Sequence, residues 1–167
     1  MPEKKTIERA HAAKRAGKSS STQAGAFVKE QIDHVREGKH GAKSAKQAIA
    51  IGLSEARRSG VKAKAPKKGT ASEATRKKAA KDTQAGQHKT KRSASTESKA
   101  KAKRSATSTR VLKREGTKAA SHTALSRQTH ASASRRSAAD RSASAKKGWA
   151  TRRKTASSKA SAARHAR

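Results

Sequence analysis

The sequence predicts a mostly disordered chain with α-helical segments, a marginal helical hairpin in the N-terminal third, and no β-sheet. Large apolar residues are scarce, since Ile, Leu, Val and Phe together number 12 of 167. Positive charge is in large excess, because 44 lysines and arginines face 11 acidic residues and leave a formal charge of +33. A chain with this balance buries too little apolar surface to offset the entropy of folding. Most of the other apolar residues are alanine, which favours helix but buries little area.

Composition divides the chain into three parts. Residues 1–66 form a helical head with a net charge of +9, and eight of the twelve large apolar residues lie between positions 27 and 61. Residues 67–86 form a short basic helix and linker. Residues 87–167 form a low-complexity cationic tail of Lys, Arg, Ser, Thr and Ala, which we expect to be disordered. The head is therefore the part in which a fold is expected.

The first helix of the head is expected over residues 3–16. Pro2 suits the first turn of a helix, Glu3 lies near the positive end of the helix dipole, and Gly17 is a C-terminal stop. The apolar stripe of this helix consists of Ile7 and alanines, so the helix is marginal.

The second helix, over residues 22–37, has stronger signals. Ser20 and Gln23 have the spacing of a capping box, and Gly38 ends the segment. At about 100° per residue, five apolar side chains share one face of this helix: Ala24, Phe27, Val28, Ile32 and Val35.

The third helix, over residues 45–59, repeats these signals. Ser44 and Gln47 form a second capping box, and Gly60 is the stop. The alternation of Ile49, Ile51 and Leu53 also fits a strand, but Gly52 interrupts it and no partner strand is visible, so we favour helix. Its apolar face and the short glycine turn before it predict a hairpin with the second helix.

The hairpin is expected to be unstable as an isolated monomer. Burial of its eight large apolar side chains releases too little free energy to order about 40 residues. A homodimer through the head, or folding against DNA, would provide the missing contacts.

Helix signals weaken beyond the head. Thr70 and Glu73 have the spacing of a capping box for the short basic helix that follows Pro66. In the tail, the apolar residues at 111–112 and Leu125 predict transient helices at most.

Several classes of function are excluded by what the sequence lacks. The chain has no cysteine, so neither a disulfide framework nor a thiolate zinc site is expected. The closest histidine pairs, His34 with His40 and His122 with His130, lack metal-ligand spacing, and we expect no metal and no cofactor. No combination of Ser, His and Asp sits on a rigid scaffold, so the protein is not expected to be an enzyme.

Membrane association is not expected either. No segment approaches the ~18 apolar residues of a membrane span, and the N-terminus has no apolar run of the secretory type. We expect a cytoplasmic protein associated with the nucleoid, or a nuclear protein if the source is eukaryotic.

The charge itself points to a polyanionic partner. Duplex DNA carries one phosphate charge per about 1.7 Å, so 33 positive charges match about 16 base pairs of duplex. Structured RNA presents phosphates just as densely, and the composition does not separate the two. We expect the nucleic acid to be contacted by basic residues spread along the chain and by the one tryptophan: Lys39, Lys43, Lys46, Arg57, Arg58, Arg76, Lys77, Lys78, Arg92, Arg104, Arg135, Arg136, Arg141, Lys146, Lys147, Trp149, Arg152, Arg153 and Lys154.

Two of these groups suggest a more specific mode of contact with DNA. The turn from Gly38 to Ser44 lacks the glycines of a nucleotide-binding loop, but Lys39 and Lys43 beside a helix start suit one DNA phosphate; an ordinary glycine turn explains the residues equally. Lys46, Gln47, Arg57 and Arg58 lie on the polar side of the third helix, and a solvated basic face is favoured there over a groove-reading helix.

Trp149 lies between Lys146 and Lys147 on one side and Arg152, Arg153 and Lys154 on the other. It is suited to stacking on a base or to insertion in a minor groove, and a tail residue without a partner is the favoured alternative. With one Trp and one Phe in the chain, no aromatic platform for single strands is expected.

Two stretches carry a family resemblance. Residues 21–25 (STQAG) and 38–53 (GKHGAKSAKQAIAIGL) resemble a family of small basic bacterial proteins that carry a domain of unknown function and are described as DNA-binding or histone-like. Residues 118–127 are similar to tails in the same family. The Lys, Ala and Ser-rich tail also resembles linker-histone tails, with residues 65–68 (APKK) as the one motif. The resemblance implies a bacterial cytoplasmic or nucleoid protein.

The leading hypothesis is therefore histone-like DNA binding without sequence specificity, through neutralisation of phosphates by the tail. An RNA-binding or ribosome-associated basic protein is the second hypothesis. The third is a helical dimerisation or protein-interaction module whose cationic tail is accessory.

Overall fold

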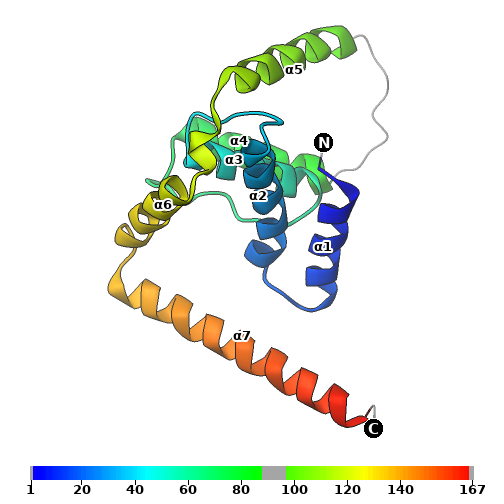
Figure 1. Cartoon of the computed structure of the whole chain (residues 1–167), viewed down its shortest axis with the longest axis vertical. Coiled ribbons are helices and arrows are strands. Elements are labelled where there is room, and N and C mark those ends of the chain that lie inside the picture. The colour runs from blue at the N-terminus through cyan, green and yellow to red at the C-terminus, as the bar shows by residue number, and fades with distance from the viewer. Residues whose placement is uncertain (1, 88–96, 166–167) are drawn as a thin grey trace. The chain divides into compact units, whose positions relative to one another are not determined.

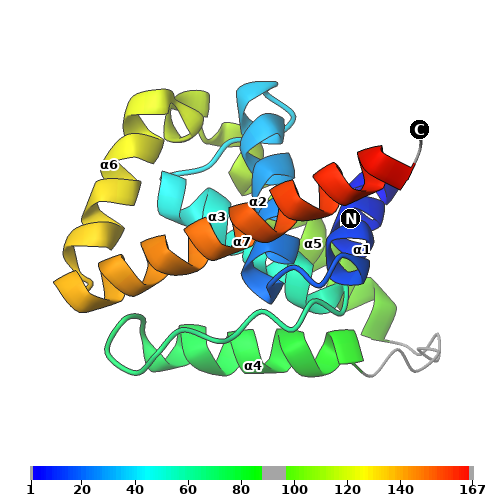
Figure 2. The ribbon, with the colours of Figure 1, turned by 90° about the horizontal axis from the view of Figure 1, so that it is seen from below.

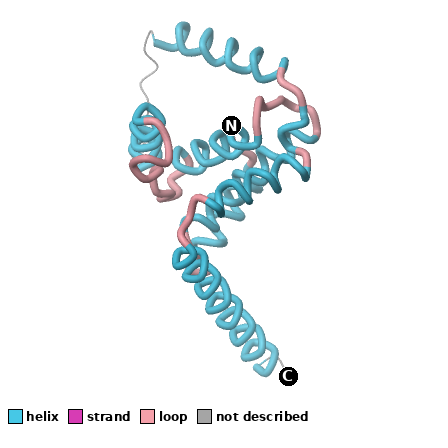
Figure 3. The backbone as a smooth tube through the Cα atoms, turned by 90° about the vertical axis from the view of Figure 1, so that its left-hand side faces the viewer, coloured by secondary structure: helices cyan, strands magenta, loops and turns pink. Residues whose placement is uncertain are grey.

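The computed structural model describes residues 2–87 and 97–165, and it is built from helices (Figure 1). The side chains of residues 97–105, 154–155 and 158–165 are not described. The described part of the chain contains no strand (Figure 3). Its helices, in order, are α1 (Lys4–Arg15), α2 (Ser20–Arg36), α3 (Ala45–Arg58), α4 (Glu73–Gln87), α5 (Glu97–Arg114), the 3-10 helix η1 (Thr117–Ala120), α6 (His122–Ser134) and α7 (Ala138–His165).

The prediction of a mostly disordered chain is wrong, whereas the predicted absence of a sheet agrees with the structure. Helices α5, α6 and α7 occupy most of the stretch for which a disordered tail is predicted. Alanine, lysine and arginine are strong helix formers, and serines at residues 121 and 137 accept hydrogen bonds from the backbone N–H groups of Ala124 and Asp140 at helix starts. The start of the predicted tail, residues 88–96, lies outside the described residues.

The helices of the head end where glycines follow them. Gly17, Gly38 and Gly60 have φ angles of 65°, 72° and 90°, the left-handed region that favours glycine after a helix. The strand alternative for residues 49–53 is not realised, because α3 runs through them. The sequence predicts helices over residues 3–16, 22–37 and 45–59. In the structure these helices are Lys4–Arg15, Ser20–Arg36 and Ala45–Arg58.

The predicted caps are partly displaced. Ser44 accepts from the backbone N–H of Gln47 at 3.2 Å, as its spacing predicts. Ser19, rather than Ser20, caps α2 by accepting from Thr22 at 3.3 Å. Ser72, rather than Thr70, accepts from the N–H of Thr75 at the start of α4. A neighbouring serine can thus take over the cap when the chain enters the helix one or two residues away.

The core between α1, α2 and α3 is small and rich in alanine. Phe27 is fully buried, and it forms a cluster with Ala10 of α1, Ala24, Ala56 of α3 and the two residues Val61 and Ala63 that follow α3, with Ile7 and Leu53 against it. Part of the apolar stripes of α2 and α3 is therefore covered by α1 and by the segment after α3.

A second cluster brings part of the predicted tail onto the head. Ala119 and Ala120 of η1 are buried against Val35, Ala42 and Ala48. The connection is also polar, because the backbone N–H of Gly41 donates to the Leu112 carbonyl at 2.8 Å. Arg36 Nε donates to the Ala120 carbonyl at 3.0 Å.

Helix α4 packs against α3 (Figure 2), and the side chain of Asp82 links the two helices. Asp82 is 5% exposed, and it accepts from Ser54 Oγ at 2.7 Å and from Arg58 Nε at 2.8 Å. Burial by itself raises the pKa of Asp82, but the hydrogen bonds from Ser54 and Arg58 and the positive charges of Arg58 and Lys78 outweigh it and hold the pKa below its ordinary value.

Glycine allows α2 and α3 to approach closely. A Cβ atom at Gly52 would lie 2.7 Å from the Val28 Cα and 2.9 Å from the Phe27 carbonyl oxygen, both backbone atoms that cannot move aside. Gly25, on α2, has nothing within 4 Å of the equivalent position.

Gly52→Ala is therefore expected to destabilise the protein by about 1–3 kcal/mol through overpacking between two backbones. Gly25→Ala is the matched control, and it should stabilise by up to about 1 kcal/mol because alanine is the better helix former. Urea unfolding followed by circular dichroism measures both changes. Equal effects of the two substitutions would contradict the close approach of α2 and α3.

The Asp82 contact predicts a pH dependence. Because the folded-state pKa is depressed, its stabilisation is complete above about pH 4 and is lost as pH falls through the folded pKa. We expect Asp82→Asn to lower the free energy of unfolding by about 1–3 kcal/mol at neutral pH. The difference from the wild type should shrink toward about pH 2.

Glu73→Gln provides the control for this experiment, since Glu73 belongs to an exposed pair with Lys77. Its effect should stay below about 0.5 kcal/mol at neutral pH. A difference between wild type and Asp82→Asn that does not change with pH would show that the Asp82 carboxylate is not what holds α4.

Candidate nucleic-acid interface

The densest positive charge lies in the C-terminal compact unit, Ser126–Arg167. This segment has twelve lysines and arginines and one acidic residue, Asp140. Every described side chain of α7 is exposed, and so are Arg135 and Arg136 before it. The unit therefore presents cations to solvent with almost no carboxylate to pair with them.

Local hydrogen bonds begin α7 and join it to α6. Ser137 Oγ accepts from the Asp140 backbone N–H at 3.1 Å and donates to the Asp140 carboxylate at 2.9 Å. Asp140 lies in the first turn, where a negative charge favours the helix dipole. Arg141 Nη1 donates to the Arg136 carbonyl at 2.7 Å and thereby braces the turn between the two helices.

Positive side chains surround α7 instead of lining one face. At about 100° per residue, the cations fall into three stripes about 120° apart, and each stripe has a member in the central stretch: Arg152, Arg153 and Lys147. A helix that is polar all round has no apolar face to pack against its own chain. The side chains of α7 that the structure describes are exposed on all sides of the helix.

Trp149 lies on α7 among these cations. Its side chain is 69% exposed, whereas Phe27, the other large aromatic residue of the sequence, is fully buried. Trp149 is therefore the one aromatic ring of the Phe, Tyr and Trp classes that a ligand can reach.

Several predicted contact residues of the head and of α4 have carboxylate partners instead. Lys39 Nζ lies 3.0 Å from Glu37 and 3.6 Å from Glu3, and Lys77 lies 3.0 Å from Glu73. Arg58 and Lys78 both pair with Asp82, at 2.8 Å and 3.7 Å. The positive charge of these side chains is already partly neutralised.

Arg57 has a structural position. It is 6% exposed, and its guanidinium donates to the carbonyls of Ala63 at 3.1 Å and Lys64 at 3.0 Å. It fixes the segment after α3 and is not part of the exposed basic surface. Together with the Arg58 pair, this leaves α3 as a helix packed between α2 and α4 rather than one free to enter a groove.

The remaining candidates differ in how they are placed. Lys43 and Lys46 are exposed at the start of α3, where Gln47 Oε1 accepts from the Lys43 backbone N–H at 2.8 Å. Arg76 is half-buried on α4. Three candidates fall outside the description: the whole of Arg92 and the side chains of Arg104 and Lys154.

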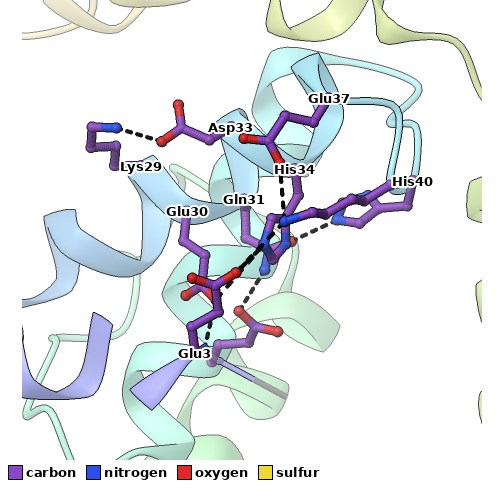
Figure 4. Close-up of polar contacts among 10 residues, drawn as sticks. Glu3, Lys29, Glu30, Gln31, Asp33, His34, Glu37 and His40 are labelled. Atoms are coloured by element: carbon purple, nitrogen blue, oxygen red, sulfur yellow. Dashed lines mark hydrogen bonds and ion pairs between the residues drawn. The ribbon is translucent and has the colours of Figure 1, made fainter. Parts of the chain in front are cut away.

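A polar cluster between α1, α2 and α3 was not predicted from the sequence (Figure 4). The backbone N–H of Glu3 donates to Glu30 Oε1 at 2.7 Å, and His34 Nε2 lies 3.3 Å from Glu3 Oε1. Behind them, Gln31 Nε2 donates to Glu55 Oε2 at 2.7 Å. The spacing of Glu30 and His34, one turn apart on a helix, was the available signal; Glu3 comes from a distant part of the sequence.

The carboxylates of this cluster have opposite pKa shifts. Burial raises the pKa of Glu55, and the nearby charge of Glu30 raises it further. The hydrogen bond with His34 and the charge of Lys39 lower the pKa of Glu3. Acidic groups are thus concentrated in the head, away in sequence from the cations of α7.

The comparisons with known proteins give a match for most of the head and the few residues that follow it. A family of unknown function (DUF6496) matches residues 11–69, from within α1 to the turn before α4. This confirms the domain of unknown function that the resemblance implied for the head. Neither a curated protein nor a solved structure shows a significant match to the chain.

Among the described helices, none has both the length and the apolar character needed to cross a bilayer.

Proposed function

We propose that the protein binds duplex DNA without sequence specificity and associates with the nucleoid, as histone-like proteins do. The observation that supports this most directly is the exposed, almost purely cationic surface of α7. A 28-residue helix is about 42 Å long, which corresponds to about 12 base pairs of duplex. Release of the counterions condensed on those phosphates provides the free energy of binding.

The arrangement of cations around α7 suits contact with more than one duplex. Phosphates of one duplex can engage one or two of the three stripes, and the remaining stripe still faces outward. The absence of base-reading geometry in the described α3, whose arginines are held by Ala63, Lys64 and Asp82, supports binding that is independent of sequence.

Duplex DNA is favoured over single-stranded RNA because the surface offers a single exposed ring of the Phe, Tyr and Trp classes. Modules that read single strands stack bases on exposed rings. Here Phe27 is in the core and only Trp149 is exposed.

Binding should depend steeply on salt. If ten phosphates are engaged, the logarithm of the association constant should fall with the logarithm of salt concentration with a slope of about −9. Fluorescence anisotropy with two duplexes of about 25 base pairs and unrelated sequence, titrated at several salt concentrations, measures the slope. The comparison of the two duplexes measures how far binding depends on sequence. A slope near zero, or strong preference for one sequence, would contradict the proposal.

The double substitution Lys146→Gln with Lys147→Gln should reduce the magnitude of that slope by about 1.8 and weaken binding to every sequence equally. The matched control is Lys29→Gln with Lys77→Gln, which removes the same charge. Lys29 pairs with Asp33 and Lys77 with Glu73 inside their own helices, so the control should change the slope much less. Equal losses in the two variants would show that α7 has no special part in binding.

Trp149 provides an intrinsic reporter of the same event. Because it is the one tryptophan and lies among the α7 cations, its emission should change as duplex is added and should return when salt displaces the duplex. Competition with structured RNA at equal phosphate concentration then ranks the two polyanions. Stronger displacement by RNA than by DNA would replace the proposed partner by RNA.

A further inference from the structure

We propose that Glu3, Glu30 and His34 bind one divalent cation of the Zn²⁺ class and thereby fasten the start of α1 to α2. This site is separate from the phosphate-binding surface proposed for α7. No nucleic acid is required for it.

The fold assembles three ligand atoms from two segments. Glu30 and His34 are one turn apart on α2, so both side chains project from the same face. Glu3 is the residue before α1, and its backbone N–H donates to Glu30 Oε1 at 2.7 Å, which fixes the start of α1 over that face. One ligand atom from each residue lies within 4.8 Å of the other two (Figure 4).

The separations fit a small cation. His34 Nε2 is 3.3 Å from Glu3 Oε1 and 4.0 Å from Glu30 Oε1. Ligands at the Zn–N and Zn–O bond lengths of a tetrahedral site are about 3.3 Å apart. The separation between His34 and Glu3 already matches that spacing, and all three ligand atoms lie within 4.8 Å of one another.

An independent observation points to a missing ligand. The side chain of Glu30 is only 4% exposed, yet its Oε2 is buried without a hydrogen-bond partner in the described structure. Buried carboxylate oxygens are normally hydrogen-bonded, paired or bound to a metal, because desolvation of the charge is otherwise uncompensated. A cation between Glu30 and His34 supplies the partner.

The donor set selects the kind of metal. An imidazole nitrogen with two carboxylates suits Zn²⁺ and related transition metals, whereas Mg²⁺ and Ca²⁺ prefer shells made of oxygen alone. The Glu3 side chain is 53% exposed, so water can complete the coordination from the solvent side. Lys39, now 3.6 Å from Glu3, keeps its second partner Glu37 at 3.0 Å when Glu3 turns to the metal.

The test is a titration of the full chain, first stripped with EDTA, with Zn²⁺ alone in competition with a chromophoric chelator. We expect one Zn²⁺ per chain and a weaker response to Mg²⁺. Glu30→Gln and His34→Gln should each weaken Zn²⁺ binding at least about tenfold, because second-sphere and ligand losses in metal sites have effects of this size or larger. His11→Gln removes an exposed histidine of α1 outside the cluster, and it should bind Zn²⁺ as the wild type does.

A second variant and a second readout distinguish loss of the metal site from misfolding of the variant. Glu3→Gln alters the most exposed ligand, so its circular dichroism should match the wild type while Zn²⁺ binding falls. Zn²⁺ should raise the Tm of wild type and His11→Gln by about 5 °C, but not that of Glu3→Gln or His34→Gln. Zn²⁺ binding that is unchanged in His34→Gln and Glu3→Gln, or no binding by the wild type, would overturn the site. Neither result bears on DNA binding, which is measured separately.

Discussion

Repulsion among lysines and arginines is the constraint on which the rest of the structure depends. A net charge of +33 opposes any compact state, so helices pack against one another where their cations have partners. In the head and α4, carboxylates pair with several of the cations: Asp82 of α4 joins that helix to α3, and Glu37 and Glu3 pair with Lys39. In α7, Asp140 is the one acidic residue, and the cations whose side chains are described are exposed. That excess of exposed positive charge is the basis of the proposed affinity for a polyanion.

Close backbone packing compensates for the shortage of large apolar residues. Phe27 and Val35 are the two largest fully buried side chains, and alanines fill most of the remaining core. Helices meet at glycines, because a Cβ at Gly52 would collide with Val28 and one at Gly86 would lie 1.9 Å from the Arg57 carbonyl oxygen. Short distances between backbones give many dispersion contacts from small side chains. The head therefore needs less apolar area than the sequence estimate assumed.

Local signals in the sequence predicted the helices of the head. The features that the sequence analysis did not predict depend on contacts between residues far apart in the chain. Glycine stops and the Ser44 cap are local, so they were readable. The docking of Ala119 and Ala120, the buried position of Arg57 and the meeting of Glu3 with His34 depend on residues far apart in sequence. The prediction of a mostly disordered chain was wrong because it gave more weight to the scarcity of large apolar residues than to the helix propensity of alanine, lysine and arginine. At the candidate interface, the exposure of α7 follows from composition, whereas the pairing of the head cations does not.

Hydrogen exchange of backbone amides in the full chain, with and without a random 20-base-pair duplex, tests the central claim most directly. If the exposed cations of α7 bind phosphate, amides across α7 should become protected on adding the duplex, while those of α2 and α3 in the core should change little. Protection that rises in α2 and α3 and leaves α7 unchanged would place the contact on the head and contradict the account.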